Sequence, residues 1–343
     1  GYPSINISLT ASHSQNTRSK TVNLVLPTFQ GNVERVYPFV KKNGQKKGFF
    51  KNINLQYSFR GENRINTTDS LFFKKGMFDD AKYGMKHSIP VSTNFKVLKH
   101  LSVSMNGNFD EIWTGNTINR TDYNISNQQQ SEKIKIKGFD RFNQYDFGMS
   151  VGTTIYGLFN FKENSKIQSI RHVIRPSVSY NIRPSFKKYY DTYIIDADGN
   201  TAEYTRFEDN FFGLPSKRYS SSIGLQISNN LEAKVKDKDS LATEPKKVTI
   251  LNNLNISTNY NLAVDSLKLS PIRMSTGTNL FKNKLNINLS ATFDAYALSD
   301  SGLRINKLNI SNGGSLLRMT SANMNMNFSI NSKSLKSKNK EEN

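Results

Sequence analysis

Apolar and polar residues alternate one by one along most of the chain, and this period of two is typical of β-strands with two different faces. Ile5, Ile7 and Leu9, for example, alternate with Asn6 and Ser8. Helical periodicity is almost absent. The alternation predicts strands within residues 5–9, 22–26, 53–59, 83–89, 101–109, 134–136, 147–161, 174–182, 223–235, 250–262, 272–280, 285–293 and 322–330.

With fainter candidates, the pattern predicts about 13 to 14 strands. Many of them reach the roughly 9 to 11 residues that a tilted transmembrane strand needs, whereas strands of globular proteins are usually about 5 to 6 residues long. No run approaches the roughly 18 to 20 apolar residues of a membrane helix, which excludes an α-helical membrane protein. We therefore expect an all-β protein built on antiparallel strands.

The polar face of the predicted strands distinguishes a membrane barrel from a soluble sandwich. This face is rich in Asn, Ser, Thr, Lys and Arg, as at Asn286, Asn288 and Ser290, which suits a wet lumen, while the apolar face would contact lipid. Short turns such as 279–284 alternate with long polar connections at 60–80, 112–132 and 184–218, as in outer-membrane barrels. We expect an antiparallel transmembrane β-barrel, with Trp113 as an aromatic residue at the membrane interface.

Composition and charge agree with this expectation. Of the 343 residues, 36% are apolar, against roughly 45 to 50% in soluble globular chains, so the chain is poor in core-forming material. The net charge of +20 makes anionic partners plausible. The absence of cysteine excludes disulfides, thiolate metal sites and cysteine nucleophiles.

Five segments resemble the β-barrel region of the lipopolysaccharide-assembly outer-membrane protein family LptD, also called organic-solvent-tolerance or OstA-like proteins. They include IQSIRHVIRPSVSYNIRPSF (167–186) and NGGSLLRMTSANMNMNFSI (312–330); the others lie at 4–39, 189–200 and 243–275. The chain is similar to a divergent, cysteine-free and Asn-rich branch, and the resemblance covers nearly all of it.

This resemblance implies a non-enzymatic translocon, without cofactors, in the outer membrane of a Gram-negative bacterium. Such a translocon contacts outer-membrane lipids, receives lipopolysaccharide from an LptA-like periplasmic bridge protein, and holds an LptE-like plug lipoprotein in its lumen. The strand count is about half of what the family barrel needs, so we interpret residues 1–331 as part of a larger barrel. Residues 332–343 are interpreted as a charged flexible tail or a truncated loop.

Basic residues that oppose apolar positions on the predicted strands are the candidate contacts for lipopolysaccharide phosphates. Arg binds phosphate in a bidentate manner, and Lys supplies a point charge. The alternative is that these charges are solvated, or pair with acids such as Glu232 and maintain the shape of the barrel. The candidates are Lys133, Lys135, Lys137, Arg171, Arg175, Arg183, Lys234 and Lys236.

Other motifs predict no catalytic or metal site. Gly148 to Gly152 match GxSxG, but alternation continues through the motif, so the strand-to-helix elbow of a hydrolase is not expected. The sequence DADGN (196–200) lacks the glycine and glutamate positions of a calcium loop, and we interpret it as a turn. The four histidines are scattered without metal-ligand spacing.

Three other functions remain open from the sequence. Another outer-membrane barrel, such as a porin or a TonB-dependent receptor, would show the same alternation. A soluble extracellular β-sheet adhesin is a further alternative, although the strand lengths favour it less. Nucleic-acid binding would suit the charge, but no recognition helix or RNA-binding aromatic motif appears, so we expect no nucleic-acid partner.

Overall fold

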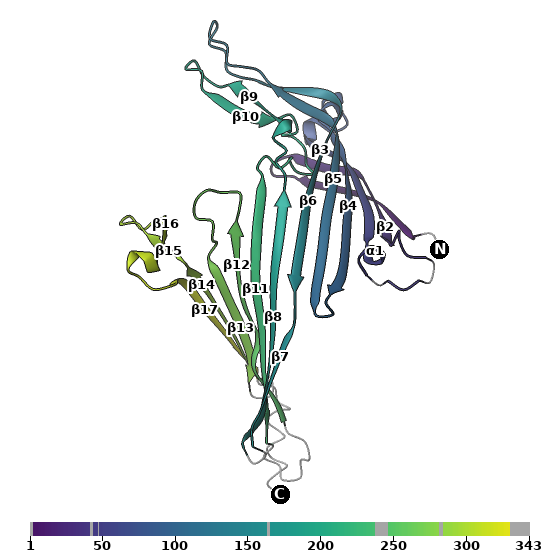
Figure 1. The fold of residues 1–343 in the computed structure, drawn as a ribbon. Helices are drawn as coiled ribbons and strands as arrows, with labels where there is room; N and C mark the ends of the chain where they lie inside the picture. Colours follow the sequence, from purple (N-terminus) through teal and green to yellow (C-terminus); the bar gives the residue numbers. More distant parts are fainter. Residues whose placement is uncertain are drawn as a thin grey trace. The chain divides into compact units, whose positions relative to one another are not determined.

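The computed structural model describes residues 3–41, 44–46, 48–162, 165–236, 246–280 and 284–329, and within them the chain is almost entirely β-structure (Figure 1). No described helix is both long enough and apolar enough to cross a membrane. The helical elements are α1 (Gly48–Asn52), α2 (Lys75–Asp79) and the 3₁₀ turns η1 (Asp69–Leu71), η2 (Lys187–Tyr189) and η3 (Ile310–Asn312).

Most of the strands belong to one large antiparallel sheet. The strands are β1 (Ile5–Asn16), β2 (Thr21–Val36), β3 (Asn54–Thr68), β4 (Lys82–Val97), β5 (Leu101–Arg120), β6 (Lys133–Gly152), β7 (Ile155–Asn160), β8 (Ile167–Arg183), β9 (Tyr190–Ile194), β10 (Thr201–Thr205), β11 (Ser220–Val235), β12 (Lys246–Asn261), β13 (Ile272–Leu280), β14 (Leu285–Asp294), β15 (Tyr296–Leu298), β16 (Arg304–Leu308) and β17 (Arg318–Phe328).

The large sheet has 13 strands in the order β1-β2-β3-β4-β5-β6-β8-β11-β12-β13-β14-β17, with β7 paired to β8. The pairs β9–β10 and β15–β16 form two small separate sheets. The predicted all-β fold, with its antiparallel sheet of about 13 strands, is confirmed. Within the described residues the sheet does not close, because β1 and β17 each have a single neighbour.

The chain divides into two compact units, which are considered one at a time. The first comprises Gly1–Phe95, Ser104–Met149 and Asn181–Ser220. Its main core joins Ile112 on β5 and Phe142 on β6 to Phe186, Tyr189 and Phe207, which all come from the connection between β8 and β11. Figure 1 shows the β9–β10 hairpin of this connection beside the end of β5, where the Ile118 amide donates to the carbonyl of Arg206.

The second unit comprises Lys96–Val103, Ser150–Tyr180 and Ser221–Asn343. Its strands β12, β13, β14 and β17 lie side by side (Figure 1). Large apolar side chains on these strands are exposed, and Met324, Met326 and Phe328 each leave more than half of their surface uncovered. Soluble monomers rarely expose a contiguous apolar face of this kind, so the face requires an apolar environment.

Three details of the predicted strands were wrong. The strand expected to end near Trp113 continues to Arg120, and the separate segments 134–136 and 147–152 form one strand, β6. The long strand predicted for 147–161 is interrupted at residues 153–154, where β7 begins. The connection 184–218, expected to be a long polar stretch, contains the β9–β10 hairpin and residues of the main apolar core. The predicted tail at 332–343 lies outside the described residues.

Candidate functional site

The most regular polar surface is one face of the strands β13, β14 and β17, all in the second unit. Residue pairs across these strands form three rows that are polar throughout: Asn279, Asn286 and Asn327; Gly277, Asn288 and Asn325; Ser275, Ser290 and Asn323. Successive side chains of a strand point to opposite faces. The intervening rows are therefore on the other face, and β14 and β17 fill them with apolar pairs such as Leu289 and Met324.

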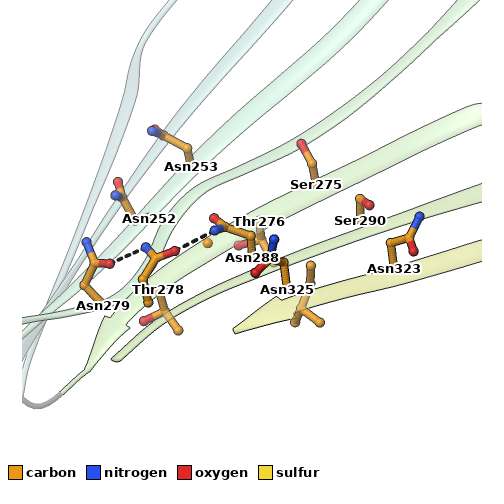
Figure 2. Close-up of a pocket in the computed structure, with 13 residues that line it drawn as sticks. Asn252, Asn253, Ser275, Thr276, Thr278, Asn279, Asn288, Ser290, Asn323 and Asn325 are labelled. Atoms are coloured by element: carbon orange, nitrogen blue, oxygen red, sulfur yellow. Dashed lines mark hydrogen bonds between the residues drawn. The ribbon is translucent and has the colours of Figure 1, made fainter. Parts of the chain in front are cut away.

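The three polar rows border a cleft of about 390 Å³ (Figure 2). Asn286 donates to the side-chain oxygen of Asn279 at 2.6 Å, and Asn288 donates to that of Asn286 at 2.6 Å. Gly277 leaves room for the Asn288 side chain in the middle row, because a Cβ at position 277 would lie only 2.8 Å from the Asn288 side-chain oxygen. Only neutral groups line the cleft: Asn252, Asn253, Ser275, Thr276, Gly277, Thr278, Asn279, Asn286, Asn288, Leu289, Ser290, Asn323 and Asn325.

Neutral amides can donate and accept hydrogen bonds at the same time. A surface of Asn and Ser therefore hydrates well and can exchange hydrogen bonds with hydroxyl-rich molecules, whereas it offers no charge to hold an ion. The cleft can accommodate a polar chain without a strong attachment. The sequence predicted a polar face from Asn286, Asn288 and Ser290, and the structure places these three residues on it.

The three predicted lysines of β6 pair with acidic residues in the first unit. Lys133 lies 2.8 Å from Asp209 and 3.3 Å from Glu208. Lys137 lies 2.7 Å from an Asp79 oxygen, and Lys135 lies 3.7 Å from Asp80. These lysines are therefore already neutralised by the protein. Sequence reasoning missed Glu208 and Asp209 because more than 70 residues separate them from Lys133, and no local pattern marks such a pair.

Glu208 and Asp209, in the connection between β10 and β11, form the centre of an ionic network. Burial acts to raise the pKa of Glu208, but hydrogen bonds from Arg120 and Lys133 outweigh this effect and hold the pKa below its ordinary value. Burial opposes ionisation of Asp209 in the same way, and Lys133 and Lys82 lower its pKa overall. Both carboxylates are thus fixed in the charged form, and they attach the connection to β5 and β6.

The other five predicted basic residues have different surroundings within their own units. Arg183 pairs with Asp146 at 3.4 Å in the first unit. In the second unit, Arg171 and Lys234 line a small cleft together with Glu232 and Lys247. The remaining two candidates, Arg175 and Lys236, are exposed.

A comparison with protein families matches residues 1–296 to the family described as LptD protein. The chain belongs to the LptD family. No curated protein matches the chain. The LptD family acts in lipopolysaccharide transport and assembly at the outer membrane of Gram-negative bacteria, so the open antiparallel sheet is part of an outer-membrane β-barrel. The resemblance inferred from the sequence is confirmed.

Trp113, the predicted interface residue, lies in a cluster of aromatic and charged groups on β4, β5 and β6 of this LptD-family chain. Its indole donates to Glu111 at 2.8 Å, and its ring centroid lies 4.2 Å from that of His87 and 5.7 Å from that of Phe139. Arg141 donates to the same carboxylate at 2.8 Å. An amphipathic cluster with an apolar body and a polar edge suits a membrane interface, which remains our expectation for Trp113.

Two motifs noted in the sequence, GxSxG and DADGN, have the local structure that we expected. The GxSxG match at 148–152 lies entirely within β6, so Ser150 is a strand residue. Asp196 accepts hydrogen bonds from the backbone amides of Asp198 and Asn200, which forms a tight turn between β9 and β10. Side-chain and backbone hydrogen bonds from Asn200 lower the pKa of Asp196. Across the described residues no cluster of His, Asp or Glu could hold a metal ion.

Proposed function

We propose that this chain forms part of the wall of an outer-membrane translocon that inserts lipopolysaccharide into the outer leaflet. The two-faced sheet of β13, β14 and β17 is the observation that carries the proposal. One face is an exposed apolar surface that suits acyl chains, and the other is a neutral polar surface that suits the sugars of lipopolysaccharide. Membership of the LptD family supports the same reading.

The wall would work with the partners that the family requires. An LptA-like periplasmic bridge protein would deliver lipopolysaccharide, and an LptE-like lipoprotein would occupy the lumen. Residues 1–331 would form the barrel portion, with 332–343 as a charged tail or truncated loop. The lysines of β6 and Arg183 would stabilise the wall through their ion pairs, while Arg171, Arg175, Lys234 and Lys236 would contact the phosphates of the lipid.

Depletion of the gene in the bacterium that carries it tests the proposal directly. Lipopolysaccharide should disappear from the cell surface and accumulate in the periplasm and inner membrane, and a plasmid copy should restore export. Continued export during depletion would refute the proposal, and a selective loss of solute uptake would favour a porin or receptor.

A matched pair of substitutions on β14 tests which face contacts lipid. Leu289→Lys places a charge on the apolar face, which costs about 2 to 4 kcal/mol near the bilayer midplane, whereas Asn288→Lys places the same charge on the polar face. We expect the first variant to reach the membrane in strongly reduced amounts and the second in normal amounts, measured by heat-dependent migration in SDS gels. Equal amounts of both variants would contradict the assignment of the faces.

A further inference from the structure

A second cleft, of about 260 Å³, lies in the second unit where β8, β11 and β12 meet the short strand β7. Three cationic side chains line it, Arg171 of β8, Lys234 of β11 and Lys247 of β12, and the single acid in the lining is Glu232. Lys247 was not among the residues predicted from the sequence. The cleft differs from the neutral Asn cleft because it carries excess positive charge.

The register of the sheet concentrates this charge. Lys234 and Lys247 are direct cross-strand partners on β11 and β12, and like charges placed directly opposite each other destabilise a sheet. Glu232 does not offset them well, since it lies 3.8 Å from Arg171 and both side chains of that pair are about half exposed. The two lysines therefore lie side by side on one face of the sheet, where a bound anion would offset their repulsion.

The surrounding strand ends add more positive charge. Lys246 pairs with Val235, next to Lys234, and the Lys236 amide donates to the carbonyl of Lys166 at 3.0 Å. Segments 166–171, 232–236 and 246–249, all within the described residues, contain six Lys or Arg and the acid Glu232, and the sequence of the intervening residues 237–245 adds Lys238 and the acids Asp237, Asp239 and Glu244, which still leaves an excess of positive charge. Such a local excess attracts anions and strengthens their binding.

Apolar side chains border the cationic cleft. Leu158, which lines it, is 63% exposed, and Tyr156, on the same face of β7, is 66% exposed. The Arg171 guanidinium lies 5.8 Å from the centre of the Tyr156 ring, which orients the guanidinium near these apolar groups. Cations beside an exposed apolar strand match an amphiphile that has an anionic head and a hydrocarbon body.

The cleft also lies at a defined end of the strands. At this end the strands are joined by the connections 161–166, 236–245 and 281–284, of 6, 10 and 4 residues, whereas the connections 262–271 and 295–317, of 10 and 23 residues, leave the opposite ends of the same antiparallel strands. Outer-membrane barrels have their shorter turns on the periplasmic side. The connections at the cleft's end are on average the shorter ones, which favours the periplasmic side for the cleft.

We propose that Arg171, Lys234 and Lys247 form a binding site for the phosphate group of a lipid head group at the periplasmic end of the wall. Arg171 supplies a planar fork of donors and the two lysines supply point charges, a combination that suits the several oxygens of a phosphomonoester. Leu158 and its neighbours on β7 contact the start of the hydrocarbon part. This assignment deepens the proposed function and rests on it for the source of the lipid.

Binding of a phosphate-bearing lipid to the purified full-length protein tests the site. Phosphatidic acid in detergent micelles is titrated against the wild type, the double variant Lys234→Gln Lys247→Gln, and the control Lys307→Gln on the β15–β16 hairpin. We expect at least a tenfold loss of affinity in the double variant and no change in the control. Diacylglycerol, which lacks the phosphate, should not bind to the site.

Several outcomes would overturn this assignment. Unchanged affinity in the double variant, or an equal loss in the control, would exclude the cleft as the site. Displacement of the lipid by inorganic phosphate at equal concentration would show that free phosphate is the ligand. The double variant removes a like-charge pair, so its heat-dependent gel migration should match or exceed that of the wild type, which separates lost binding from misfolding. Because binding is measured on purified protein, it can fail while the depletion experiment succeeds.

Discussion

Replacement of Phe207 by alanine should release the connection between β8 and β11 from the sheet of the first unit. The Phe207 side chain is 1% exposed. Its ring centroid lies 4.7 Å from that of Phe142 on β6, in a tilted arrangement. It lies 5.7 Å from that of Tyr189, and these two rings are edge to face. The Arg206 guanidinium lies 4.7 Å from the same ring. The residue thus joins the connection to the strand beneath it.

The expected effect is large because truncating a buried Phe to Ala costs about 3 to 5 kcal/mol. The lost contacts hold the connection against β5 and β6, so the cost falls on local opening instead of on unfolding of the whole sheet. At about 1.36 kcal/mol for each factor of ten, the open form should become roughly 10²- to 10⁴-fold more populated. Leu214→Ala, in the same connection but 46% exposed, should cost less than about 0.5 kcal/mol.

Amide hydrogen exchange of the detergent-solubilised protein measures this opening. The informative amides are those of Phe186, which donates to Ser216 at 2.9 Å, and Ile118, which donates to Arg206 at 2.9 Å. Both should lose protection in Phe207→Ala and keep it in Leu214→Ala, while amides of the membrane-facing strand segments stay protected. Equal protection of Phe186 and Ile118 in the wild type and in Phe207→Ala would refute the reasoning.

Two further predictions concern the same unit. In the folded protein the pKa values of Glu208 and Asp209 lie below their ordinary 4.5 and 3.8. The two ionised carboxylates therefore contribute their full share to the stability of the folded connection above the ordinary pKa values. This contribution is lost as the pH falls through the lower pKa values of the folded state. Protection of the amides of the connection against hydrogen exchange, corrected for the intrinsic exchange rate, should fall in this acidic range. The double variant Glu208→Gln Asp209→Asn should abolish this pH dependence. An unchanged pH profile in the double variant would contradict the prediction. Gly84→Ala should destabilise the protein by about 1 to 3 kcal/mol, because a Cβ there would overlap the backbone carbonyl oxygen of Trp113 at 2.7 Å. Its unfolding temperature in SDS gels should fall, whereas Gly61→Ala, whose Cβ would have its nearest neighbour at 3.7 Å, serves as the neutral control, and equal temperatures would argue against the overlap.

The predicted strands agree with the structure where a side chain's surroundings follow from period two alone. On β14, Asn286, Asn288 and Ser290 share the polar face as expected. The prediction failed at the end of β5, because polar residues there no longer signal a loop once another segment covers them. Thr114, Asn116 and Thr117 look like loop residues in the sequence, yet all are buried strand residues.

The sequence by itself determined the β class, the two faces of the strands, their approximate number and the family, because each of these is expressed in local alternation or in extended similarity. Only the tertiary structure decided which charges are already neutralised, as for Lys133 with Asp209, and which like charges are placed opposite each other, as for Lys234 and Lys247. The reason is physical. Alternation is a property of neighbouring residues, whereas the electrostatic environment of a side chain depends on strand register and on connections many residues away.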